Sequence, residues 1–109
     1  MGLFKKSFQK NVTRDNQFFK NYAIKINGLL RYTEDNEKVT TQLKKLQDDF
    51  QYTVATSDRH AKKCERNIEK MYEEIKSMLQ QPSWDEQKVL LIVRNMGAEI
   101  DEINSMRKM

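Results

Sequence analysis

The stretch from Glu34 to Gln81 contains neither glycine nor proline, and this feature constrains the fold more than any other. Glycine and proline most readily end a helix, so their absence favours one long helical segment. Apolar or small side chains recur at spacings of three and four, the pattern of a buried helix face or coiled-coil seam. The seam positions are Val39, Leu43, Leu46, Phe50, Val54, Ser57, Ala61, Cys64, Ile68, Met71, Ile75 and Met78.

The weakest part of this stretch is residues 53–58, with the sequence TVATSD. β-Branched, small and capping residues predominate there, and these types form helices poorly. Just before it, the apolar spacing takes two consecutive steps of four, from Leu46 to Phe50 and from Phe50 to Val54. Such a stutter locally unwinds a left-handed supercoil. A change in the helix is therefore expected near this point.

A continuous helix over residues 34–81 would be roughly 70 Å long at about 1.5 Å per residue. We predict this continuous helix first, because the apolar spacing keeps its phase after Val54 and no glycine or proline forces a stop. In the alternative, the helix breaks within residues 53–58. Thr56 or Ser57 would then cap a new helix, with Asp58 in its first turn.

A shorter helix is expected before the long one, over residues 13–32. Its apolar stripe recurs at helical spacing, and it ends either at Gly28 or near Tyr32. Thr33 is the expected cap of the following helix, because acidic residues that favour a helix N-terminus come directly after it. The stripe consists of Phe19, Tyr22, Ile26 and Leu29 or Leu30.

The last helix is expected over residues 83–107. Pro82 interrupts the preceding pattern, and Ser83 with Glu86 has the spacing of a capping box. Gly97 lies inside this helix and costs about 1 kcal/mol relative to alanine. The apolar stripe comprises Val89, Ile92 or Val93, Met96, Ile100, Ile103 and Met106.

These segments predict a single all-α domain over residues 1–109, an elongated antiparallel helical bundle. It has three helices with a long central one, or four if the central helix breaks near residues 53–58. Hydrophobic residues make up 38% of the chain and charged residues 33%, enough apolar material for a narrow core only. Two-helix pairs bury little surface, so in the three-helix form either the first helix begins near Leu3 and three helices overlap in the middle, or a homodimer completes the core. We rank the homodimer first.

The positive charge of the chain is concentrated at its N-terminus. Residues 1–32 carry seven basic side chains and one acidic one, whereas the whole chain has a net charge of +4. Residues 1–12 have the pattern of a basic amphipathic helix, which can lie on an anionic membrane surface. Alternatively, the segment docks on the bundle or forms a basic tail. The expected membrane or anion contacts are Leu3, Phe4, Lys5, Lys6, Phe8 and Lys10.

No pattern in the sequence predicts catalysis, a cofactor or a metal. His60 and Cys64 are four residues apart and share a helix face, but the chain contains no other histidine or cysteine. Two ligands do not make a site, so we expect Cys64 to be a small seam residue beside a flanking histidine. There is also no phosphate-binding glycine loop and no nucleophile with a base in helical reach. We therefore expect a protein that is not an enzyme.

The sequence thus predicts a non-enzymatic interaction or scaffold protein that acts through coiled-coil-like self-association or by binding a partner helix. The single cysteine and the lack of a long apolar run favour a cytoplasmic location, with a membrane surface as a further binding partner. The alternative is a nucleic-acid-associated accessory protein that uses the basic, aromatic N-terminal region. The residues expected to carry association are Leu43, Leu46, Phe50, Ile68, Met71 and Ile75.

Overall fold

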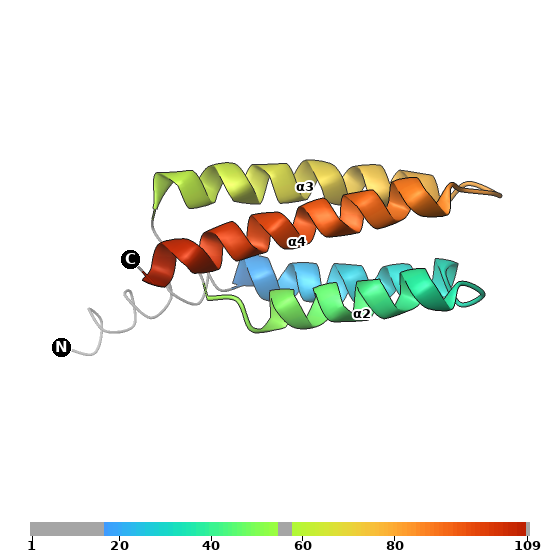
Figure 1. Cartoon of the computed structure of the whole chain (residues 1–109), viewed down its shortest axis with the longest axis horizontal. Helices are drawn as coiled ribbons and strands as arrows, with labels where there is room; N and C mark the ends of the chain where they lie inside the picture. Colours follow the sequence, from blue (N-terminus) through green and yellow to red (C-terminus); the bar gives the residue numbers. More distant parts are fainter. Residues whose placement is uncertain (1–16, 55–57, 109) are drawn as a thin grey trace.

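The chain folds into an all-α bundle, as the sequence predicts. The computed structural model describes residues 17–54 and 58–108, and no strand occurs among them. The first helix covers residues 17–29 of this part and continues as a 3₁₀ turn, η1 (Leu30–Tyr32). Helices α2 (Glu37–Gln51), α3 (Arg59–Leu79) and α4 (Glu86–Lys108) follow. Successive helices run in opposite directions, and α4 lies between α2 and α3 (Figure 1).

The continuous helix predicted over residues 34–81 is wrong, and the alternative with a break is confirmed. Helix α2 ends at Gln51 and α3 begins at Arg59, so the weak segment connects two helices. The Thr53 hydroxyl donates to the Asp49 carbonyl. In a continuing helix that carbonyl would accept from the backbone amide of Thr53, so the side chain competes with the helix at this point. Folding back at this point lets α3 bury its apolar face inside the same chain, which a straight rod of one chain cannot do.

Helix starts lie later than the sequence predicted. The expected cap Thr33 is instead joined by its hydroxyl to the Thr40 hydroxyl at 2.8 Å, and Asn36 caps α2 by accepting from the Val39 amide. The expected caps Thr56 and Ser57 lie outside the described residues, and Asp58 caps α3.

The capping box predicted at Ser83 is also wrong. Helix α4 begins at Glu86, and the Asp85 carboxylate accepts from the Gln87 and Lys88 amides at 2.9 and 3.2 Å. In α2, α3 and α4 the functioning cap is therefore an Asn or Asp directly before the helix, where a short side chain reaches the free amides of the first turn.

Most of the predicted seam is buried, but its last turns are shifted by one residue. All four seam residues of α2 are buried, whereas Val54 is 42% exposed. In α3, Met71 and Met78 are only partly buried, and Tyr72 and Leu79 take the core positions. An α-helix of 3.6 residues per turn drifts about 20° per heptad from a strict seven-residue repeat, so the core face moves on by one position. The buried seam residues are Val39, Leu43, Leu46, Phe50, Ala61, Cys64, Ile68 and Ile75.

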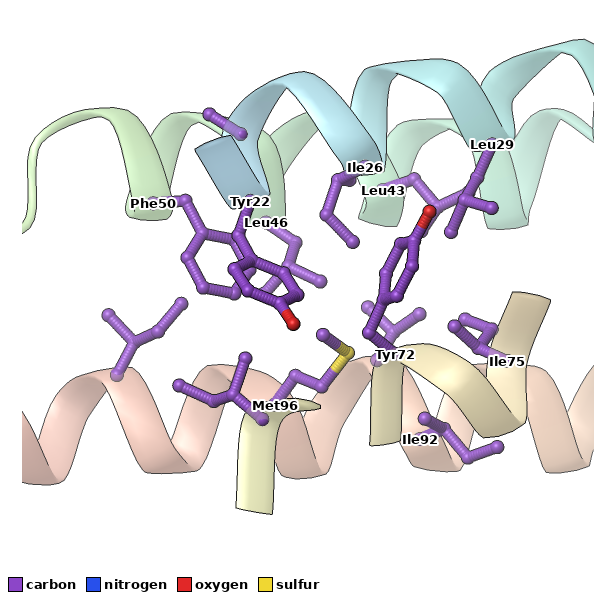
Figure 2. Packing of buried hydrophobic residues seen from close by; sticks show 14 of the residues in the cluster. Tyr22, Ile26, Leu29, Leu43, Leu46, Phe50, Tyr72, Ile75, Ile92 and Met96 are labelled. Carbon is purple, nitrogen blue, oxygen red and sulfur yellow. The ribbon is translucent and has the colours of Figure 1, made fainter. Parts of the chain in front are cut away.

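Aromatic rings join the first helix to its two neighbours. The Tyr22 ring stacks on Phe50 of α2 at a centroid distance of 5.8 Å and meets Tyr72 of α3 edge-on at 5.5 Å. Figure 2 shows Tyr22 and Phe50 across the shared core from Met96 of α4, while the ring of Tyr72 extends toward Leu43 and Leu29. All four helices therefore contribute to one hydrophobic cluster.

The predicted stripe of α4 is confirmed up to Ile103, since Val89, Met96 and Ile103 are fully buried, whereas Met106 at its end is only partly buried. Helix α4 packs against both α2 and α3. At the start of α2 and α4, the Asn36 side-chain amide donates to Glu86 at 2.9 Å, which fixes the two helix starts beside each other. None of the helices in the described residues combines the length and apolarity needed to cross a bilayer.

Candidate functional site

The residues predicted to carry association lie mainly inside one chain. Leu43, Leu46, Phe50, Ile68 and Ile75 are buried in the core that the four helices share. Met71 is partly buried and lines a groove between α3 and α4 with a volume of about 390 Å³. Because the buried side chains already pack against the chain's own helices, an association surface has to be sought on the outside of the bundle.

The predicted membrane or anion contacts, Leu3, Phe4, Lys5, Lys6, Phe8 and Lys10, lie outside the described residues. Their role remains a prediction. The nucleic-acid alternative relies on aromatic residues of the N-terminal region, but Phe19 and Tyr22 of that region are buried, and Phe18 is partly buried against Phe19. These buried rings are not available for base stacking, which requires an exposed face.

A groove with a volume of about 700 Å³ lies between α2 and α4. Leu46, Leu90 and Val93 supply its apolar lining, and Gly97 lies beside them on α4. A Cβ atom at Gly97 would meet nothing within 4 Å, so the groove is open at this point. On the outer side of α4, Leu91 is 53% exposed. This face of the bundle is therefore shallow, partly apolar and accessible.

Charges along the α2–α4 groove are separated by sign. Lys38, Lys45 and Arg94 lie in its first two-thirds, whereas Asp49 and Asp101 lie together at its far end. The helices α2 and α4 run in the same direction, so both acidic residues are at the C-terminal end of the groove (Figure 1). Burial, and then the nearby Asp101 carboxylate, raise the pKa of Asp49 above its ordinary value, and the positive charge of Lys45 offsets this only in part. The acidic end of the groove is thus without full charge compensation in the single chain.

A second polar arrangement occurs where α3 begins and α4 ends. His60 Nε2 lies 2.7 Å from Glu102 Oε1, and Cys64 Sγ donates to Glu102 Oε2 at 3.9 Å. The three ligand atoms, one nitrogen, one sulfur and one oxygen, lie within 4.8 Å of one another. His60 and Glu102 are about half exposed, at 49% and 51%, whereas Cys64 is buried. The cluster therefore has a buried thiol at its base and an open outer side.

Glu99 adds a further carboxylate on the buried side of this cluster. Its Oε1 accepts from the Asn67 side-chain amide at 3.2 Å, and its Oε2 is buried without a hydrogen-bond partner. Burial, together with the carboxylates of Glu99 and Glu102, raises the pKa of Cys64 to about 12. The thiol is therefore held in its protonated form by the surrounding negative charge and low polarity.

Sequence reasoning identified His60 and Cys64 as neighbours but missed both glutamates. Glu102 is 42 residues from His60 along the chain, and Glu99 is 32 residues from Asn67. The available signal was the i, i+3 spacing of two glutamates on one face of the last helix, which is common on solvated helices. Only the packing of α4 on α3 brings them to the histidine and the thiol.

Comparisons with protein families, curated proteins and solved structures found no match for this chain.

Proposed function

We propose that this protein is a non-enzymatic helical interaction module that pairs with a second copy of itself through the α2–α4 face. The observation that carries the proposal is the separation of charge along the α2–α4 groove. The partly apolar lining and the exposed Leu91 beside it supply surface that is favourable to bury. The seam residues that the sequence favours for association are buried inside the chain. We therefore assign association to the α2–α4 face instead.

Two-fold symmetry explains why a second copy fits this face. In a two-fold dimer the same patch of each chain meets itself, with its direction reversed when the axis is perpendicular to the groove. Lys38 lies about 16 Å from Asp49 along α2, at 1.5 Å per residue. The reversal therefore sets the basic end of one copy against Asp49 and Asp101 of the other. Pairing supplies the charge compensation that the acidic end lacks in one chain.

Small residues at Gly97 and Ala98 favour the same arrangement. Helices approach each other closely where one of them carries no bulky side chain, and nothing lies within 4 Å of the position of a Gly97 Cβ atom. Cys64 is a free, buried thiol, which is consistent with the reducing interior of a cell, so a cytoplasmic location belongs to the same proposal.

Analytical ultracentrifugation of the full chain over a range of concentrations tests the proposal. We expect a reversible monomer–dimer equilibrium that weakens in high salt, because Lys38 and Asp101 are exposed and salt screens their charges. Lys38→Glu and Asp101→Lys should each weaken the dimer by placing like charges opposite each other. The double variant Lys38→Glu/Asp101→Lys should restore it, because the reversed charges again pair across the two-fold axis.

The matched controls are Lys62→Glu and Glu73→Lys, which change exposed charges on α3. They should leave the dimer unchanged. A chain that is monomeric at all concentrations would refute self-association. A dimer that tolerates both groove substitutions, or one that the double variant does not restore, would show that another face is used.

A further inference from the structure

The cluster at the start of α3 and the end of α4 has an assortment of donors that suits a metal ion. Three side chains present a thiol sulfur, an imidazole nitrogen and a carboxylate oxygen within 4.8 Å of one another. We propose that His60, Cys64 and Glu102 form a binding site for a divalent transition metal ion, and that Zn²⁺ is the ion whose chemistry matches them. The sequence alone predicts no metal, because two ligands do not make a site and the chain has no other histidine or cysteine.

The geometry requires only small adjustments. Zinc bonds of about 2.0–2.3 Å in a tetrahedral arrangement place donor atoms about 3.5 Å apart. The present separations are 2.7 Å between His60 Nε2 and Glu102 Oε1, and 3.9 Å between Cys64 Sγ and Glu102 Oε2. Both exposed side chains can rotate, since about half the surface of each is in solvent. The buried Cys64 fixes the position of the ion, and the other two close over it.

The charge of the cluster also calls for a cation. The Glu99 Oε2 atom is buried without a partner, although an unpaired buried carboxylate oxygen is unfavourable. Binding of the ion forms a metal–sulfur bond and releases the thiol proton to solvent, while His60 binds through a neutral nitrogen. One thiolate and the Glu102 carboxylate then balance the two positive charges. Glu99 remains beside the site as a nearby anion, or completes the tetrahedron in place of a water molecule.

The donor types discriminate between metal ions. A thiolate together with an imidazole favours zinc and similar borderline ions, whereas Mg²⁺ and Ca²⁺ prefer sites made of oxygen alone. The bound ion would join the first turns of α3 to the last turns of α4, at the end of the bundle opposite the Asn36–Glu86 hydrogen bond. The site is separate from the α2–α4 groove, so it does not depend on the proposed dimer.

Titration of the full chain with Co²⁺, which substitutes for zinc and absorbs light, tests the site directly. We expect one ion per chain, with the thiolate-to-cobalt charge-transfer band and the intense visible bands of a tetrahedral centre. Zn²⁺ should displace the cobalt and raise Tm, whereas Mg²⁺ should do neither. Cys64→Ser should abolish the charge-transfer band. His60→Gln and Glu102→Gln should each weaken binding at least about tenfold, the loss that even a change beside the ligands causes.

The matched control is Glu69→Gln, which replaces an exposed carboxylate of α3. This variant should bind cobalt like the unchanged chain. Because His60 and Glu102 are exposed, their variants should fold. These variants therefore still test the site if Cys64→Ser fails to fold. Absence of a charge-transfer band from the unchanged chain at saturating cobalt would overturn the proposal. The same holds if His60→Gln and Glu102→Gln both bind with unchanged affinity, since the metal would then sit elsewhere.

Discussion

Replacing Ile68 by alanine tests which residues of α3 form the core. Ile68 lies in the middle of α3 and has no exposed surface. The substitution removes three buried carbon atoms, which at about 0.8 kcal/mol each amounts to about 2.4 kcal/mol. The cavity left behind adds to this loss, because the surrounding helices relax only in part. We expect the free energy of unfolding to fall by about 3–4 kcal/mol.

Urea unfolding followed by circular dichroism measures this loss as a lower midpoint at an unchanged m-value. In thermal unfolding the fall in Tm should be about 12–16 °C, at about 4 °C per kcal/mol for a domain of this size. Ile68→Ala should leave the oligomeric state unchanged, because Ile68 packs inside its own chain. This outcome separates an internal core residue from a residue of an association seam.

The matched control is Met71→Ala, one turn further along α3. Met71 is only partly buried at the α3–α4 groove, so its truncation should cost less than about 1.5 kcal/mol. If Met71→Ala cost as much as Ile68→Ala, or if Ile68→Ala left stability unchanged, the packing of α3 described above would be wrong. A dimer lost on Ile68→Ala while the monomer stays folded would instead support the coiled-coil seam.

Three further substitutions test individual features. Asn36→Ala should lower the free energy of unfolding by about 1–2 kcal/mol in urea titrations, since it removes the cap of α2 and the bond to Glu86; Asn36→Asp should recover only the part due to the cap. Burial, and then nearby glutamates, raise the pKa of Tyr22 to about 12 from its ordinary 10. The contribution of Tyr22 to stability is therefore complete below pH 10 and is lost as the pH rises towards 12. Tyr22→Phe should reduce that alkaline loss, measured by urea unfolding at each pH. Gly97→Ala should raise the stability of the monomer by up to about 1 kcal/mol, because the new methyl group meets no atom within 4 Å, while it weakens the proposed dimer in ultracentrifugation.

Much of the candidate groove and cluster could not be predicted from the sequence. The pairing of α2 with α4 sets Lys38 and Asp101 along one groove, and these residues carry no local signal of being neighbours. Likewise, a histidine and a cysteine four residues apart provide only two ligands, and the third, Glu102, lies near them only because α4 packs on α3. Such sites depend on which helices become neighbours, and that choice is made by packing over the whole chain.

The sequence by itself determined the helical class and most of the buried positions, because apolar residues that recur with a period near 3.6 can be recognised from local spacing alone. Val39, Leu43 and Phe50 could be placed in the core in this way, and so could Met96 of α4. The tertiary structure decided where the long segment divides. Residues 53–58 have only modestly poor helix propensity, and the helix breaks there because folding back buries a whole face of α3, a gain that no local pattern contains.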